Sequence, residues 1–353
     1  MTGGAEFQAK LLCDALVAAG RFDVVWISRR VAPDFRPVGH RVVKLPGPKA
    51  DRPGSHLLLG PELLSVLEAE APDVIYQRNG TPFTGFAAHF ARRSGRRMVW
   101  HVARDDEAMK APWSLGDLRR PMRRLEKMCL EYGARHATRI VVQTRHQESL
   151  LMQHYGRKAD LMVRNFHPLP AESIDKSGVR TVLWVANLKD MKQPEVFLRL
   201  AERHAGRRDV KFAMIGRPSS DAGLMNRIRE FGTRNPHFSY LGELTQDQVN
   251  GLLATSHLLV NTSKFEGFSN TFIQAWMRGV PVLSLNADPD GLLLERGIGY
   301  CAAGDEEALA RELAALLGDG ARLGAMGDRG RAYALAEHTE ANIGSLIGLL
   351  DGD

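Results

Sequence analysis

Short hydrophobic runs alternate along the chain with longer stretches in which hydrophobic positions recur every three or four residues. The runs, rich in β-branched and aromatic residues, predict strands, and the stretches, such as Ala5–Ala19, predict amphipathic helices. Repeated strand, helix, strand order is typical of parallel sheets with helices on both faces. The predicted strands are Phe22–Ser28, His40–Leu45, Asp73–Gln77, Arg97–Val102, Arg139–Gln143, Asp160–Arg164, Arg180–Ala186, Val210–Ile215, Phe238–Leu241, His257–Asn261, Pro281–Leu285 and Gly299–Cys301.

One irregular segment divides the two series of strands. Asn165–Gly178 contains two prolines, a glycine and many polar residues, which is typical of a connection. A length of 353 residues also suits two domains of ordinary size. We therefore predict two doubly wound α/β domains, residues 1–168 and 179–353, joined by residues 169–178, with the last helix free to pack back on the first domain. Ligands bind such sheets at the carboxyl ends of the strands, so we expect a cleft that draws on both halves.

The glycine pair Gly3-Gly4 opens the first helix and should follow a strand, yet only Met1 and Thr2 precede it. Two explanations remain. Either the first strand is missing from this chain, which we favour, or the front sheet is one strand short.

Charge is divided unevenly between the two halves. Residues 1–168 contain 27 Lys and Arg against 17 Asp and Glu, a net charge of +10, whereas residues 169–353 contain 20 against 24, a net charge of −4. The basic front half favours a polyanion, an anionic membrane surface or a phosphorylated ligand. The three cysteines lie far apart and predict neither a disulfide framework nor a zinc site. Without a membrane-length apolar run or a leader-like start, we expect a cytoplasmic protein.

Residues 113–132 combine basic and apolar side chains at helical spacing. Such a helix predicts contact with an anionic membrane, which would place the protein peripherally on the inner face of the cell membrane. The alternative is an ordinary packing helix with a solvated cationic face. Nucleic acid fits less well, because no recognition motif for it is present.

The chain from residue 257 to residue 285 carries the most chemistry. A polar loop follows the strand that ends at Asn261 and delivers Ser269, Asn270 and Thr271 to the start of a helix. Free amides and the positive end of the helix dipole favour an anion there. The alternative is an ordinary loop with an N-capping asparagine.

Two further side chains belong to this loop and helix. Glu266 on the loop can accept hydrogen bonds from hydroxyls, and Gln274, one helical turn in, can reach a ligand seated on the loop.

This stretch resembles the glycosyltransferase family 4 type, which has the GT-B fold of two Rossmann-like domains facing a central cleft. The family pattern is a glutamate, seven residues, a second glutamate and then Gly-x-Pro-Val. The chain has Glu266-Gly267-Phe268 and Gly279-Val-Pro-Val282, with Gln274 in place of the second glutamate. The resemblance implies that Gln274 holds the ribose of a nucleotide, and that the residues from Gly267 to Thr271 surround the donor.

The resemblance also assigns donor-binding residues elsewhere. Lys192 matches the lysine that binds the diphosphate, Asn187 stands where the family usually has an arginine, and Gly3-Gly4 matches its glycine loop. His101, at the end of a strand, matches a histidine near the transferred sugar. Before the family is considered, a lone histidine at a strand end is more often structural.

The function implied is retaining transfer of a sugar from a nucleoside-diphosphate sugar to a glycan, a lipid-linked glycan or another acceptor, with Glu266 and His101 as catalytic residues. No Asp-x-Asp motif stands at a strand end, so Lys192 and the amides near Ser269–Thr271 must meet the charge of the leaving group, and neither a metal nor another cofactor is expected. Two alternatives stay open, namely an inactive nucleotide-sugar-binding protein and a sugar-nucleotide epimerase.

Overall fold

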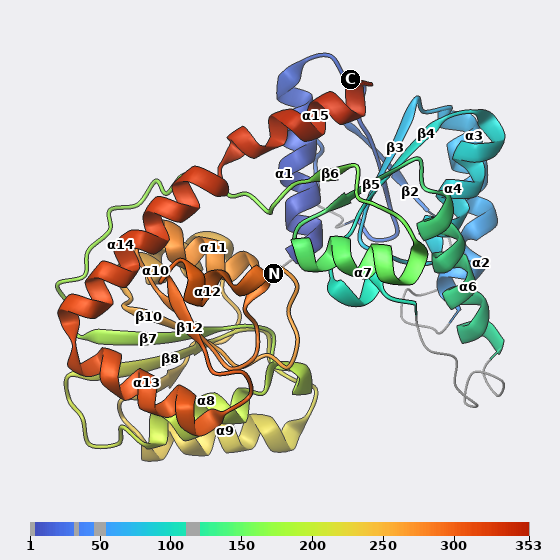
Figure 1. Cartoon of the computed structure of the whole chain (residues 1–353). Helices are drawn as coiled ribbons and strands as arrows, with labels where there is room; N and C mark the ends of the chain where they lie inside the picture. The colour runs from blue at the N-terminus through green and yellow to red at the C-terminus, as the bar shows by residue number, and fades with distance from the viewer. Residues whose placement is uncertain (1–3, 32–34, 46–53, 111–120, 353) are drawn as a thin grey trace. The chain divides into compact units, whose positions relative to one another are not determined.

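The computed structural model describes residues 4–31, 35–45, 54–110 and 121–352. Its contacts divide the chain into two compact units (Figure 1). The amino-terminal unit comprises Gly3–Arg164 and Asn342–Asp353, and the carboxyl-terminal unit comprises Asn165–Ala341. All twelve predicted strands are confirmed, each overlapping its predicted range. The division at Asn165 falls at the start of the irregular segment noted in the sequence, and residues 163–179 contain neither helix nor strand.

The carboxyl-terminal unit contains one six-stranded sheet in the order β12-β11-β10-β7-β8-β9, with every pair parallel. From β7 the chain first adds strands on one side and then, from β10, on the other, so the winding reverses between β7 and β10. In open α/β sheets such a reversal opens a crevice at the carboxyl ends of the two strands. The strands are β7 (Arg180–Val185), β8 (Val210–Ile215), β9 (Phe238–Tyr240), β10 (Leu258–Asn261), β11 (Val282–Ser284) and β12 (Gly299–Cys301).

Helices cover both faces of this sheet because alternate strand residues point to opposite sides. Val182 and Trp184 of β7 belong to the core beneath α8, α9 and α13, whereas Leu183 and Val185 belong to the core beneath α10, α11 and α12. The helices of this unit are α8 (Pro194–Glu202), α9 (Ala222–Arg234), α10 (Gln246–Thr255), α11 (Asn270–Met277), α12 (Leu292–Glu295), α13 (Glu306–Gly318) and α14 (Gly320–Glu337), with short turns η2 (Asp190–Lys192), η3 (Pro289–Gly291) and η4 (Glu340–Asn342).

The sheet of the amino-terminal unit is split. Strand β1 pairs with β2, and a separate sheet has the order β3-β4-β5-β6, all parallel. Among the described residues no strand pairs with both β1 and β3, so the two sheets are separate. The strands are β1 (Val25–Ser28), β2 (Arg41–Lys44), β3 (Val74–Arg78), β4 (Arg97–His101), β5 (Arg139–Val142) and β6 (Leu161–Met162).

Helices α4 and α6 of this unit cross at two glycines. A Cβ on Gly85 would lie 2.3 Å from the carbonyl oxygen of Cys129, and one on Gly133 would lie 2.6 Å from the carbonyl carbon of Thr84, so only glycine permits this approach. Gly133 and Ala134 of α6 are therefore buried, while its first five residues are exposed. The helices of this unit are α1 (Gly4–Ala19), α2 (Ser55–Leu58), α3 (Gly60–Glu70), α4 (Pro82–Ser94), η1 (Asp105–Ala108), α6 (Pro121–His136), α7 (Arg145–Tyr155) and α15 (Ile343–Asp351).

The last helix, α15, belongs to the amino-terminal unit by its contacts. Two backbone carbonyls at its end, those of Leu349 and Leu350, accept hydrogen bonds from Arg97 at the start of β4. Among the described residues no helix combines the length and the apolar character needed to cross a membrane.

Candidate functional site at the strand ends

The loops that follow β7 and β10 are tied together. Thr262, just after β10, accepts a hydrogen bond from Trp184 Nε1 at 2.8 Å and donates one to the carbonyl of Lys192 at 2.6 Å. The amide of Lys264 also donates to the carbonyl of Met191 at 2.8 Å. Because β7 and β10 are neighbours in the sheet, these bonds fix both loops at the point where the winding reverses.

Lys192 and Glu266 meet at this point. Lys192 Nζ forms an ion pair with Glu266 Oε1, and the two side chains are 22% and 17% exposed. The same carboxylate oxygen accepts hydrogen bonds from Ser263 Oγ at 2.8 Å and from Asn261 Nδ2 at 3.3 Å. The carboxylate is thus held by three donors and stays within reach of solvent. Lys192, predicted to bind the diphosphate, and Glu266, predicted to be catalytic, therefore lie in direct contact.

Asn187 follows β7 beside a second close approach of backbone. A Cβ on Gly216, after β8, would lie 1.7 Å from the carbonyl oxygen of Ala186, so this position requires glycine. The amide of Gly216 donates to the carbonyl of Gly242, after β9, at 2.8 Å. The Oδ1 atom of Asn187 is buried and has no hydrogen-bond partner among the described residues, which leaves it available to a ligand donor.

Helix α11 begins where the sequence predicted it. Ser269 is the N-cap residue, and its Oγ lies 2.7 Å from Oγ1 of Thr271. Asn270 Oδ1 accepts a hydrogen bond from Asn165 Nδ2 at 3.0 Å, so its side chain is held by the irregular segment. Gly267 precedes Phe268, whose ring is 5% exposed and packs 4.8 Å from that of His338. Phe268 thus meets the core with its side chain, and only its backbone faces the loop.

The structure buries Gln274 to 2% exposure. Its Nε2 donates to Gln246 Oε1 at 2.6 Å and to Asn250 Oδ1 at 2.8 Å, both on α10. The amide donors of Gln274 are thus directed to α10, and the amide oxygen is the atom left to accept a bond from a ribose hydroxyl.

In the amino-terminal unit His101 ends β4 and is 1% exposed. Its Nδ1 lies 2.8 Å from the Tyr76 hydroxyl and 3.0 Å from Arg78 Nη1. Burial, together with the positive charge of Arg78, lowers the pKa of His101 well below its usual value. His101 is therefore a neutral imidazole whose Nδ1 accepts hydrogen bonds.

Nearby, Glu107 of η1 is also 1% exposed. Its Oε2 accepts a hydrogen bond from the amide of Ala103 at 3.0 Å, and burial raises the pKa of its carboxyl group. Gly4 is the first residue of α1, whereas Gly3 lies outside the described residues. Within the described ranges no three His, Cys, Asp or Glu side chains gather in a way that could hold a metal ion.

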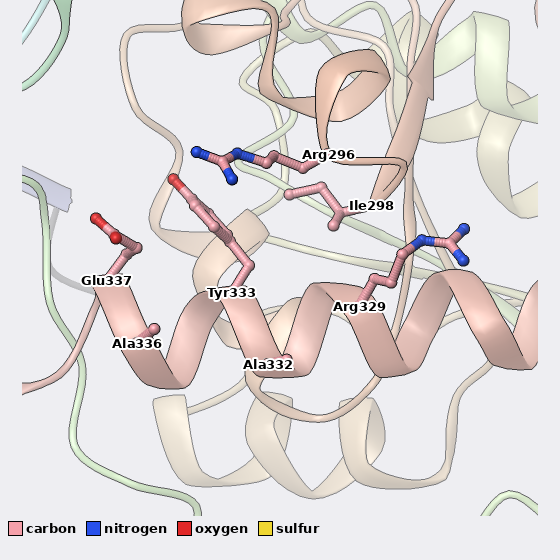
Figure 2. A pocket seen from close by; sticks show the side chains of 7 residues that line it. All are labelled: Arg296, Ile298, Arg329, Ala332, Tyr333, Ala336 and Glu337. Carbon is pink, nitrogen blue, oxygen red and sulfur yellow. The ribbon is translucent and has the colours of Figure 1, made fainter.

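A cavity of about 310 Å³ lies apart from these residues. Figure 2 shows Tyr333 projecting from α14 toward Arg296, with Arg329 further along the helix. Arg329 Nε donates to the carbonyl of Gly297 at 2.9 Å. None of the residues that line this cavity was assigned to the donor site, and Ile298 among them directly precedes β12. Its lining residues are Arg296, Ile298, Arg329, Ala332, Tyr333, Ala336 and Glu337.

Sequence reasoning missed four residues that complete these sites. Asn261 and Ser263 hold the Glu266 carboxylate, and Tyr76 and Arg78 hold the His101 imidazole. Position offers a signal for the second pair, because Tyr76 lies within the predicted strand Asp73–Gln77 and Arg78 directly follows it. No comparable signal marks the first pair, since polar residues are ordinary in such loops.

Two family models match the sequence. Residues 2–163 match the model described as Glycosyltransferase Family 4, and residues 179–319 match the model described as Glycosyl transferases group 1. No curated protein matches significantly.

Solved structures of glycosyltransferases are similar over nearly the whole chain. WaaG, a glycosyltransferase involved in lipopolysaccharide biosynthesis, is 15% identical with a TM-score of 0.79, covering 100% of this chain and 97% of that one. Sucrose-phosphate synthase from Thermosynechococcus elongatus is 18% identical with a TM-score of 0.76, covering 99% and 93%. HepE of Anabaena in complex with UDP-glucose is 17% identical with a TM-score of 0.73, covering 99% and 96%. These neighbours have the GT-B fold, which confirms the predicted fold class.

Proposed function

Because the chain belongs to the glycosyltransferases of the family 4 type, we propose that it transfers a sugar, with retention of configuration, from a nucleoside-diphosphate sugar to a glycan, lipid-linked glycan or other acceptor. The observation that carries this proposal is the Lys192–Glu266 ion pair at the reversal point between β7 and β10. The structure of HepE with UDP-glucose supports a uridine nucleotide as the first donor to test.

In the proposed mechanism Lys192 and Glu266 give up their ion pair and each binds a different part of the donor. A diphosphate that binds Lys192 releases Glu266, which then accepts hydrogen bonds from sugar hydroxyls while Ser263 and Asn261 keep it oriented. As the bond to the sugar breaks, negative charge grows on the departing diphosphate. Lys192 and the positive end of the α11 dipole stabilise that charge. His101, being neutral, would serve as a hydrogen-bonding group rather than as a cation.

The first experiment measures thermal stabilisation by UDP, GDP and ADP, each with and without magnesium. We expect one nucleotide to raise the melting temperature, equally well in the absence of magnesium, and Lys192→Ala to abolish the shift. Lys264→Ala is the matched control, since Lys264 lies on the neighbouring loop after β10 and pairs with Asp190. A magnesium requirement would contradict metal independence, and an unchanged shift in Lys192→Ala would contradict the assigned diphosphate site.

An inactive nucleotide-binding protein is the second candidate, favoured by the two amide donors that Gln274 gives to α10 instead of a ligand. Turnover separates the candidates. Release of nucleotide from the stabilising nucleotide sugar supports a transferase, and binding without any turnover supports the second candidate.

The first turns of α6 support a peripheral membrane contact. Met122, Leu125 and Met128 are 38%, 48% and 46% exposed, and basic residues Arg123, Arg124 and Lys127 lie between them. Residues 113–120 of the predicted segment lie outside the described residues. We expect flotation with phosphatidylglycerol vesicles, but not with phosphatidylcholine vesicles, and loss of flotation in Leu125→Ser. Met152→Ser, at a residue 47% exposed on α7, should float normally. Equal flotation with both lipids would contradict the electrostatic contact.

A further inference from the structure

The chain enters and leaves the carboxyl-terminal unit at two buried residues that are bonded to each other. Asn165 is the first residue of this unit, and His338 directly follows α14 near the end of the unit. His338 Nδ1 lies 2.6 Å from the carbonyl oxygen of Asn165, and the amide of His167 donates to the carbonyl of His338 at 2.8 Å. Because a carbonyl oxygen only accepts, Nδ1 of His338 carries the proton in this bond. The two ends of the unit are therefore fixed to one another.

Asn165 also reaches the loop that leads into α11. Its Nδ2 atom donates to the carbonyl of Phe268 at 3.0 Å and to Asn270 Oδ1 at 3.0 Å. An amide nitrogen carries two N–H groups, so this one side chain can hold both oxygens. The Phe268 ring in turn packs 4.8 Å from that of His338. The start of α11 is thus held by the residues at which the chain enters and leaves the unit.

A second contact holds the same irregular segment away from the donor loop. Lys176 Nζ donates to the carbonyl of Leu253 at 2.8 Å and to that of Ser256 at 2.5 Å. These carbonyls lie at the end of α10, just before β10, whereas Glu266 lies on the loop that follows β10. The segment therefore has one anchor at the donor loop and another at the opposite end of the strand, and the two can be tested against each other.

We propose that Asn165 is a positioning residue, which fixes the start of α11 and thereby sets how strongly the donor site binds the charged end of a diphosphate. This inference rests on the proposed function for the diphosphate. The attraction between an anion and a helix dipole is confined to the first turn, so displacement of that turn weakens it.

The effect of this positioning should grow with the charge of the ligand. The terminal phosphate of UDP carries more negative charge than the same phosphate of UDP-glucose, because the sugar ester removes one ionisable oxygen. Loss of the Asn165 side chain should therefore weaken binding of UDP more than binding of UDP-glucose. A side chain that only supported the fold would affect both ligands equally.

The experiment compares Asn165→Ala with Lys176→Met in the full chain, by calorimetry with UDP and with UDP-glucose. For Asn165→Ala we expect UDP binding about tenfold weaker and UDP-glucose binding about threefold weaker. For Lys176→Met both affinities should stay within about twofold of the unsubstituted chain. Hydrogen exchange of residues 267–273 measures the positioning without a ligand, and it should be faster in Asn165→Ala alone. If Asn165→Ala does not fold, Asn165→Ser, which keeps one shorter donor, decides the question by the same measurements.

Three results would overturn the proposal. They are equal losses of UDP and UDP-glucose affinity in the Asn165 variant, unchanged hydrogen exchange in that variant, and equally faster exchange in Lys176→Met. If the unsubstituted chain bound neither ligand, that result would count against the proposed function. Hydrogen exchange would still decide whether Asn165 fixes the start of α11.

Discussion

At the strand ends of the carboxyl-terminal unit Lys192 is paired with a carboxylate, whereas at those of the amino-terminal unit Arg78 is paired with an imidazole. Both cations end or follow strands of parallel sheets and both are only partly buried. The difference lies in the charge of the partner. Under the proposed function Glu266 would have to be displaced before Lys192 could bind an incoming anion, whereas His101 is a neutral partner.

This difference connects each partner to a separate task. Under the proposed function a displaced Glu266 would become available to sugar hydroxyls, which would couple binding of the diphosphate to orientation of the sugar. The neutral His101 lies 2.8 Å from the Tyr76 hydroxyl and 3.0 Å from Arg78 Nη1, so this contact involves no second charge. An ion pair that can be exchanged suits the binding of a diphosphate that leaves during the reaction. A side chain that is held in one place suits the positioning of a ligand.

The largest expected effect comes from Gly216→Ala, which would disturb the backbone next to Asn187 in the carboxyl-terminal unit. The new Cβ would lie 1.7 Å from the Ala186 carbonyl oxygen, so strand ends β7 and β8 must separate. We expect the free energy of unfolding to fall by about 4 kcal/mol, measured by urea denaturation, with loss of nucleotide binding.

Gly251→Ala is the control for this substitution, because Gly251 lies within α10 and its Cβ would meet nothing within 4 Å. That variant should gain up to about 1 kcal/mol from helix propensity. Similar destabilisation of both variants would mean that the close approach between Gly216 and Ala186 does not explain why position 216 requires glycine.

Lowering the pH tests how the buried histidines of the two units affect stability. Burial lowers the pKa of His167, which lies beside Asn270, to about 4, and lowers the pKa of His101 still more clearly. The folded protein therefore binds fewer protons than the unfolded chain below pH 6.5, so stability falls as the pH falls. His167 alone should contribute a loss of up to about 3 kcal/mol between pH 6.5 and pH 4.

The measurement is the urea midpoint as a function of pH, compared between the unsubstituted chain and His167→Gln. The variant should show a shallower decline over that range because it lacks one of the groups that takes up a proton on unfolding. Parallel curves would contradict a neutral His167 in the folded state. At pH 7.5, where both forms are neutral at this position, the slopes should agree.

Substitution of Glu266 tests the exchange directly. Glu266→Gln removes the negative charge but keeps an oxygen that accepts hydrogen bonds from Ser263 and Asn261. Lys192 therefore loses its ion pair, while the conformation of the loop is kept. We expect nucleotide affinity to be unchanged or up to about threefold tighter, and turnover of the nucleotide sugar to fall about 100-fold. Calorimetry with the nucleotide and a nucleotide-release assay measure the two quantities. Weaker nucleotide binding would show that Glu266 supports the diphosphate site and does not compete for it.

The hydrophobic pattern predicted all twelve strands, because buried parallel strands are short apolar runs bounded by turn residues. Parallel order also places the loops that carry Lys192 and Glu266 after neighbouring strands, while the role of these residues in donor binding stays a prediction. The pairing of those two strands, and hence the contact between the two side chains, depends on the order of strands in the sheet, which local sequence does not contain.

Side-chain partners from distant helices were less accessible to prediction. Phe268 lies in the motif, yet its ring packs against His338, 70 positions further along the chain. The pKa of His101 is lowered by burial and by Arg78, which faces it because β3 and β4 pair in one register. Such contacts arise from tertiary packing, so residue type and spacing alone did not reveal them.

The smallest expected effect concerns Gln274, where the family pattern has a glutamate. Gln274→Glu would place a carboxylate against Gln246 Oε1 and Asn250 Oδ1, unless both of these amides rotate to present their N–H groups. Rotation requires no backbone movement, so we expect the fold to be retained. The carboxylate would then accept a stronger, charge-assisted hydrogen bond from the ribose.

An affinity gain of about fivefold for the nucleotide, roughly 1 kcal/mol, is the expected result in calorimetry. The matched ligand is the 2′-deoxy form of the same nucleotide, which should gain less because it lacks one ribose hydroxyl. An equal gain for both ligands would show that the carboxylate acts through general electrostatics. No gain for either ligand would mean that the side chain at position 274 stays bound to α10 and that other residues hold the ribose. The site would then differ from the family pattern at this position.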